Sequence, residues 1–151
     1  MGSPKFSLQN VLDIRHDKVE LLEIELGKLL AAHQQTLNLM NSLEQYQTSL
    51  FEQMGEAQTG EIDLVKLKLL LLNTLQVGKH IESVKIELKK QSAEIEKKRT
   101  EIVQAKQAEE TLTILKRKRQ EVYEAEQIQI EAQAQDDIYI ARAFRNQQQG
   151  A

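Results

Sequence analysis

The chain has 151 residues, which is enough for one ordinary domain, and its composition excludes several classes of protein. It contains no cysteine, so disulfide frameworks and thiolate metal sites are excluded. Aromatic residues make up only 4 % and charged residues 28 %, with a net charge of −3. This balance is typical of paired helices with an aliphatic seam and unlike an aromatic-rich globular core. Hydrophobic residues, at 40 % and in periodic order, argue against a disordered chain.

The distribution of proline and glycine predicts the fold. No proline follows Pro4, and the glycine-flanked stretch 55–60 is the only clustered break in the helix-friendly sequence. Inside a helix proline costs about 3 kcal/mol and glycine about 1 kcal/mol. We therefore expect a helix over about 4–54, a turn at 55–60, a second helix over about 61–145 and a frayed tail at 146–151. The predicted fold is all-α: a single coiled-coil domain over 1–151, in which two long helices form an antiparallel hairpin and the second helix is longer.

Apolar residues recur at alternating intervals of three and four, the spacing of a coiled-coil seam. With the turn centred near residue 57, facing residue numbers sum to roughly 115, which pairs Leu26 with about Lys89 and leaves the second helix unpaired beyond about Thr111. In the first helix the predicted seam is Leu8, Leu12, Arg15, Val19, Leu22, Leu26, Leu29, His33, Thr36, Met40, Leu43, Gln47, Leu50 and Met54. In the second it is Leu67, Leu71, Thr74, Val77, Gly78, Ile81, Val84, Leu88, Ile95, Ile102 and Ala105, with a register shift at Leu112, Leu115 and Val122.

Charge is distributed unevenly along the chain. Residues 85–119 hold eleven Lys or Arg against six Asp or Glu, whereas residues 120–151 hold two against six. A basic band such as Lys116-Arg-Lys-Arg119 can bind nucleic acid, but the chain is acidic as a whole and no aromatics alternate with these cations for base stacking. We expect no nucleic-acid partner; the band is either a solvated face or a surface for an acidic protein.

Residues with catalytic or metal-binding chemistry are scattered. His16, His33 and His80 occur in no metal-binding spacing, and Asp136-Asp137 is a lone acidic pair. No phosphate-binding loop or nucleophile motif is present, so the sequence predicts a protein that is not an enzyme and needs no metal or cofactor. The first ten residues lack the apolar core of a signal peptide, and the apolar run 64–75 is shorter than a membrane span. We expect a soluble, cytoplasmic protein without direct membrane insertion.

The N-terminal run from Lys5 to Arg15 resembles the opening of the FliJ family of flagellar export proteins, which reads approximately F-x-L-Q-x-V-L-x-x-R. The matching residues are Phe6, Leu8, Gln9, Val11, Leu12 and Arg15. The length, the two-helix plan and the C-terminal Arg142, Phe144 and Arg145 agree with the family. The resemblance implies a stalk similar to the central shaft of rotary ATPases. The end carrying both termini would enter a hexameric export ATPase, and the opposite end would reach a membrane export-gate protein. Substrate chaperones are further partners of the family, at an inner-membrane flagellar or type III secretion apparatus.

Two sets of contact residues follow from this resemblance and the helical register. Candidates for the ATPase contact are Phe6, Leu8, Val11, Leu12, Arg15, Arg117 and Arg119, of which the four apolar residues also serve to close the end of the hairpin. Candidates for the export-gate contact are Gln35, Leu39 and Tyr46, on a stripe with Ser42, and the residues that the pairing sets opposite them, Leu69, Asn73, Gln76 and His80. The margin of a thick coiled coil would have the same stripe.

Two other kinds of protein fit the same pattern. One is a coiled-coil chaperone that holds unfolded chains, and the other is a structural, self-assembling rod that serves another secretion or pilus system. A shaft is expected to be a monomer when free, whereas a self-assembling rod is a dimer or larger.

Overall fold

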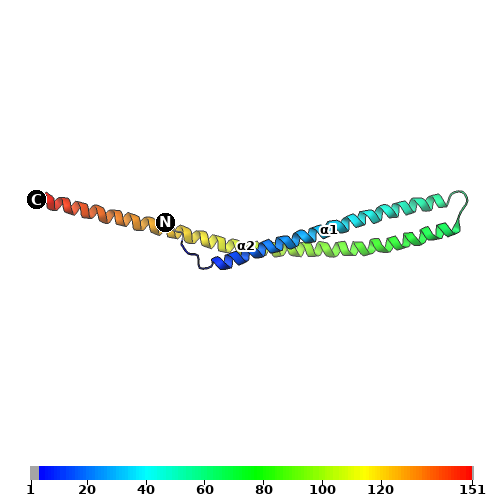
Figure 1. The fold of residues 1–151 in the computed structure, drawn as a ribbon, viewed down its shortest axis with the longest axis horizontal. Coiled ribbons are helices and arrows are strands. Elements are labelled where there is room, and N and C mark those ends of the chain that lie inside the picture. The colour runs from blue at the N-terminus through cyan, green and yellow to red at the C-terminus, as the bar shows by residue number, and fades with distance from the viewer. Residues whose placement is uncertain (1–3, 151) are drawn as a thin grey trace. The chain divides into compact units, whose positions relative to one another are not determined.

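The computed structural model describes residues 4–150 and consists of two α-helices, α1 (Gln9–Ala57) and α2 (Leu64–Gln149) (Figure 1). The helices have 49 and 86 residues, and no strand occurs within 4–150. The predicted fold class, all-α with a longer second helix, is confirmed. Helix α2 extends past the predicted end near 145, while Ala151, the last residue of the predicted tail, lies outside the described residues.

The chain divides into two compact units, and the single coiled-coil domain stays a prediction. The first unit comprises the described residues up to Lys18 and those from Ala105 onward, and the second is the continuous stretch Val19–Gln104. In the second unit, α1 and α2 run antiparallel and form a helical hairpin (Figure 1).

The loop of the hairpin occupies residues 58–63 and not the predicted 55–60. Gly55 belongs to the last turn of α1, where its carbonyl oxygen accepts a hydrogen bond from the Gln58 N–H at 3.3 Å. Gly60 has a φ of 75°, a backbone conformation that favours glycine, so it is the residue that reverses the chain. Asp63 then caps α2, because its Oδ1 accepts the N–H groups of Val65 at 3.1 Å and Lys66 at 3.3 Å.

The predicted seam of α1 is confirmed in the second unit. Every predicted position from Val19 to Met54 is buried or half-buried, including the polar His33, Thr36 and Gln47. Leu50 is the most enclosed side chain, at 2 % exposure. It belongs to a cluster of buried residues that comprises Met40, Leu50, Leu70, Val77, Ile81 and Val84. Burial of these aliphatic groups is the main stabilisation of the hairpin.

The seam of α2 differs from the prediction at its start and near its middle. Leu70 is 6 % exposed whereas Leu71 is 47 % exposed, so the prediction of Leu71 as a seam residue is wrong. The observed spacing places Leu70 three residues after Leu67, which is the regular heptad step, whereas a run of four leucines leaves that choice open from sequence. The predicted register shift at Leu112 is also wrong: Leu112 is 7 % exposed and continues the alternation of three and four from Ala105.

The pairing of the helices is offset from the prediction. Lys98 Nζ contacts Glu25 Oε2 at 2.8 Å, and His33 Nδ1 contacts Gln91 Oε1 at 3.1 Å. The residues of α2 that face α1 therefore lie roughly two helical turns further along the chain than predicted. The later loop accounts for most of this offset, because moving the loop toward the C-terminus moves every facing position on α2 in the same direction.

Candidate functional site: a basic groove in the first unit

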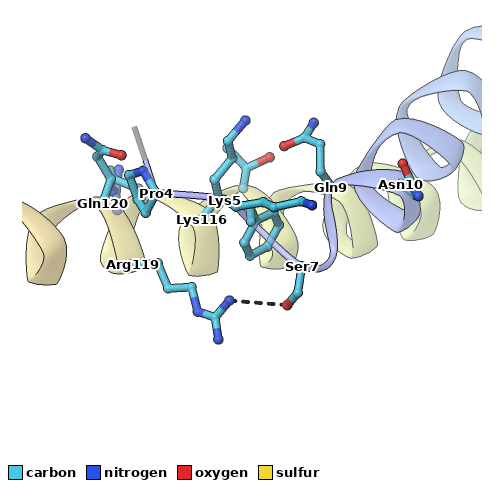
Figure 2. A pocket seen from close by; sticks show the side chains of 11 residues that line it. Pro4, Lys5, Ser7, Gln9, Asn10, Lys116, Arg119 and Gln120 are labelled. Carbon is cyan, nitrogen blue, oxygen red and sulfur yellow. Dashed lines mark hydrogen bonds between the residues drawn. The ribbon is translucent and has the colours of Figure 1, made fainter. Parts of the chain in front are cut away.

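The first unit contains a segment that the sequence analysis assigned to the first helix. Residues 4–8 are not helical, and α1 begins at Gln9, whose N–H donates to the Phe6 carbonyl at 3.1 Å. The Phe6 side chain is 8 % exposed although it belongs to a non-helical segment. Figure 2 shows this segment lying along α2, with Pro4 beside Gln120 and Ser7 near Arg119. Burial of the aromatic ring holds the segment against α2 in place of a further helical turn.

A groove of about 750 Å³ lies between this segment and α2 (Figure 2). Its lining contains four cationic side chains and no carboxylate among the described residues. Lys5 comes from the segment, whereas Lys116, Arg117 and Arg119 come from a single turn of α2. The other lining residues are Pro4, Phe6, Ser7, Gln9, Asn10, Thr113 and Gln120. Such a lining can bind an anionic group, but it offers no nucleophile paired with a base for catalysis.

Hydrogen bonds fix the geometry of the groove. Arg119 donates from an η nitrogen to Ser7 Oγ at 3.2 Å, which ties residues 4–8 to α2. Arg117 Nε lies 3.9 Å from the Glu121 carboxylate, and both side chains are about two-thirds exposed, so this pair is weak. Further along the pair, Arg15 donates to the Ala108 carbonyl at 2.9 Å, which aligns the start of α1 with α2. Arg15 and Arg119 each make a hydrogen bond between α2 and the N-terminal part of this unit, and the two bonds therefore align these parts of the chain.

The structure brings together three of the seven residues predicted for the ATPase contact. Phe6, Arg117 and Arg119 line the groove, whereas Leu12 and Arg15 are half-buried between α1 and α2. Leu8 and Val11, at 38 % and 39 % exposure, lie at the edge of that interface. The predicted sum of roughly 115 pairs Leu8 with about Gln107, whereas the α2 residues that line the groove lie between Thr113 and Gln120. Sequence reasoning missed Lys5 and Lys116 as site residues, although Lys116 belongs to the basic run it identified.

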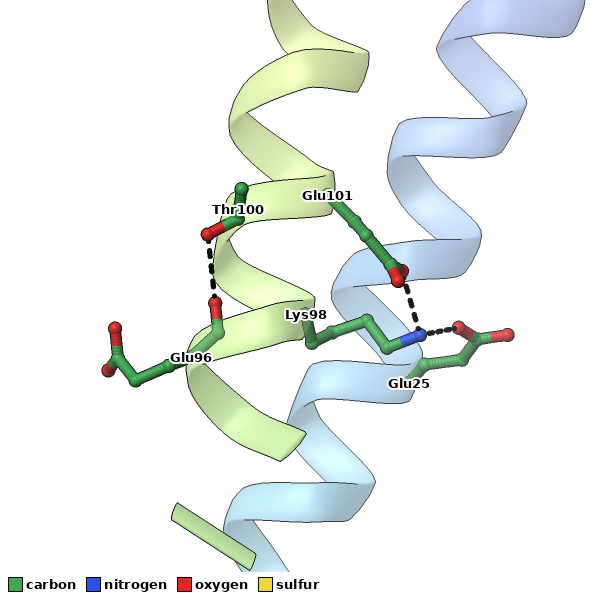
Figure 3. A network of polar contacts seen from close by, with 5 residues as sticks. All are labelled: Glu25, Glu96, Lys98, Thr100 and Glu101. Atoms are coloured by element: carbon green, nitrogen blue, oxygen red, sulfur yellow. Dashed lines mark hydrogen bonds and ion pairs between the residues drawn. The ribbon is translucent and has the colours of Figure 1, made fainter. Parts of the chain in front are cut away.

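The residues predicted for the gate contact are exposed, but the stripe on α1 and the stripe on α2 are staggered along the helix pair. In the second unit, Lys98 bridges Glu25 of α1 and Glu101 of α2, at 2.8 and 3.2 Å (Figure 3). These contacts place the flank of α1 that carries Glu25 and the flank of α2 that carries Glu101 on the same side of the helix pair. The same register places Tyr46 opposite His80, whereas it places Leu39 further along α2 than the predicted partner Gln76. The exposed residues of the two stripes are Gln35, Leu39, Ser42, Tyr46, Leu69, Asn73, Gln76 and His80.

The end of α2 is uncovered within the first unit. Every described residue from Ile128 to Gly150 is exposed, so the unpaired segment begins later than the predicted Thr111. Large apolar side chains in it are 54–75 % exposed. They are Ile128, Ile130, Ile138, Tyr139, Ile140 and Phe144. At 100° per residue these side chains are spread around the helix: Ile130 and Ala141 lie on one side, Ile128 and Tyr139 lie on the opposite side, and Ile138 and Ile140 lie between them.

Two further properties concern the described chain, residues 4–150. No helix in it is both long and apolar enough to cross a membrane. No group of three or more His, Asp or Glu side chains in it is placed to hold a metal ion.

Comparison with known proteins gives one match. The family described as flagellar FliJ protein matches residues 4–149, which is nearly the whole chain. No curated protein and no solved structure matches the chain.

Proposed function

Because the chain belongs to the FliJ family of flagellar proteins, we propose that it is a non-catalytic stalk subunit of a hexameric protein-export ATPase. The family supports an export-associated, coiled-coil role, and the proposal adds the ring as partner. In it, residues 4–8, the start of α1 and the C-terminal part of α2 contact the ATPase. The contact residues proposed are Phe6, Leu8, Val11, Leu12, Arg15, Arg117 and Arg119.

The observation that supports this role is the spread of exposed apolar side chains around α2 from Ile128 onward. Most of the stability of a helix in a protein comes from packing of its apolar side chains, and a single apolar stripe is covered by a single partner helix. Ile130 and Tyr139 lie on opposite sides and are 59 % and 75 % exposed, so covering both requires a partner that surrounds the helix. The inside of a ring does so.

The same proposal includes a second contact, in which the second unit binds a membrane export-gate protein through the stripe that contains Tyr46 and His80. The protein then acts beside an inner-membrane secretion apparatus without entering the membrane, and substrate chaperones bind the same subunit. Contact between Tyr46 and a gate protein is favoured because this aromatic side chain is 48 % exposed beside the seam.

The test is the rate of ATP hydrolysis by the partner ATPase with and without this protein. We expect stimulation by the full chain and none by a chain ending at Gln127, which lacks the uncovered part of α2. Circular dichroism melting of the truncated chain serves as control, because residues 128–150 contribute no buried side chain. Full stimulation by the truncated chain would contradict entry of this segment into the ring.

A second candidate, a coiled-coil chaperone, is favoured by one observation in the second unit. The start of α2 exposes several large apolar side chains next to the loop. They are Leu64, Val65, Leu69, Leu71, Leu72 and Leu75, with exposures of 47–75 %. Such a patch can hold unfolded segments. Suppression of the aggregation of an unrelated unfolded protein, without effect on the ATPase, would favour this function over the stalk.

A further inference from the structure

We infer that the basic groove of the first unit binds a short carboxylate-rich segment of a protein partner, with Lys116, Arg117 and Arg119 pairing its acidic side chains. The inference rests on the proposed function in one respect, that the partner is the export ATPase. It adds the chemistry of the contact, which the helical pattern and the family leave open.

The first argument is the charge of the groove. Four cations, Lys5, Lys116, Arg117 and Arg119, line it without any lining carboxylate to neutralise them. The two arginines have incomplete partners: Arg119 donates to a neutral hydroxyl at 3.2 Å, and Arg117 meets Glu121 only at 3.9 Å across an exposed pair. Charge-assisted hydrogen bonds from an incoming carboxylate are stronger than either contact.

The second argument is the size of the basic site. Lys116–Arg119 form one turn of α2, roughly 6 Å along the helix axis. Acidic residues bound this turn on both sides, with Glu109 and Glu110 before it and Glu121 after it. From Gln120 to Ala141 the helix has six acidic residues and no Lys or Arg. The site therefore fits a segment with a few carboxylates.

The same boundaries argue against a nucleic acid. A phosphodiester chain that followed α2 away from the groove would meet the acidic stretch after Gln120. The aromatic residue of the groove, Phe6, is 8 % exposed, so its ring face is not open for base stacking. A protein segment avoids both problems, because its backbone is neutral and its carboxylates need no open aromatic ring.

The experiment uses fluorescence anisotropy to measure binding of a labelled twelve-residue peptide, made of four Glu-Glu-Leu repeats, to the full chain. A peptide with Gln in place of every Glu and a twelve-nucleotide oligo-dT are the rival probes. We compare the wild type, the double variant Lys116→Glu/Arg117→Glu and the matched variant Lys89→Glu/Lys90→Glu. The matched variant has the same change of charge on exposed positions of the second unit. Circular dichroism establishes that all three chains are folded.

We expect the acidic peptide to bind on the order of tenfold more tightly than the Gln peptide, with binding weakened about tenfold by the groove variant and by no more than about twofold by the matched variant. Added salt should weaken it further. Equal affinity for the two peptides, equal loss in both variants, or tighter binding of oligo-dT would overturn the inference.

ATPase stimulation, measured on the same variants, separates the two proposals. If the acidic peptide binds through the groove but the ATPase is never stimulated, the groove inference stands and the stalk function fails. If stimulation is normal in the groove variant and the peptide does not bind, the stalk function stands and the groove inference fails.

Discussion

Lys98 of α2 and Glu25 of α1 form an ion pair of 2.8 Å across the helical hairpin of the second unit. The Lys98 ammonium also lies 3.2 Å from Glu101 one turn along its own helix, and its side chain is 20 % exposed (Figure 3). A lysine at a seam position specifies register, and here a carboxylate of the other helix meets it. This pair therefore helps to select the observed register among alternatives that bury similar aliphatic groups.

Because of this pair, the stability of the hairpin should fall at alkaline pH. Hydrogen bonds to Glu25, then to Glu101, raise the pKa of Lys98 above its ordinary value of 10.5. A raised pKa in the folded state means that the stabilisation is complete below pH 10.5 and is lost as the pH rises through the higher folded value. We expect the wild type to lose more stability than Lys98→Met between pH 9 and pH 11.5, measured by thermal melting. Lys97→Met, at the exposed neighbouring position, should follow the wild type; identical curves for Lys98→Met and wild type would exclude the effect.

Two glycines near the loop should respond oppositely to alanine. Gly60→Ala should lower the free energy of unfolding by about 1–2 kcal/mol, because its φ of 75° is strained for a side chain. Gly55→Ala should raise it by about 0.5–1 kcal/mol, because Gly55 is helical and a Cβ there meets no atom within 4 Å. Urea unfolding of the two variants decides the matter. A loss of stability in Gly55→Ala would place the turn where the sequence alone predicted it.

Neighbouring leucines provide a test of the α2 register. Leu70→Ala should destabilise the chain by about 2–5 kcal/mol, because this side chain is 6 % exposed and belongs to the buried cluster. Leu71→Ala should change the free energy of unfolding by about 0.5 kcal/mol or less, since its side chain is 47 % exposed. The two variants remove the same atoms, so their difference in urea midpoint reports the seam alone. Equal losses would contradict the observed register.

The staggered stripe of the second unit predicts where a gate protein binds. Tyr46→Ala should weaken that binding on the order of tenfold, as expected for an aromatic anchor, with little change in the melting temperature. Gln35→Ala provides a comparison within the same candidate stripe, because Gln35 is exposed on the same helix but lies away from the overlap of the two stripes at Tyr46 and His80. A stronger effect of Gln35→Ala in a pull-down titration would show that the gate contact does not centre on Tyr46.

The sequence determined that the chain forms two helices and which face of α1 is buried. Proline is absent after Pro4, so nothing interrupts either helix, and the spacing of three and four fixes the α1 seam without reference to a partner. The match of Phe6, Leu12 and Arg15 to a family pattern also needs no structure. Each of these properties is local, because it depends on neighbours within two helical turns.

Tertiary structure decided the loop, the register and the groove. Gly55 and Gly60 are equivalent in sequence, and only the cap at Asp63 and the φ of Gly60 show which one turns the chain. In a run of consecutive leucines, contact with α1 selects Leu70 over Leu71, because sliding α2 by one residue changes burial but not composition. The groove exists because residues 4–8 do not extend α1 and Phe6 is buried where this segment lies along α2. This packing joins residues more than a hundred positions apart, which no local pattern encodes.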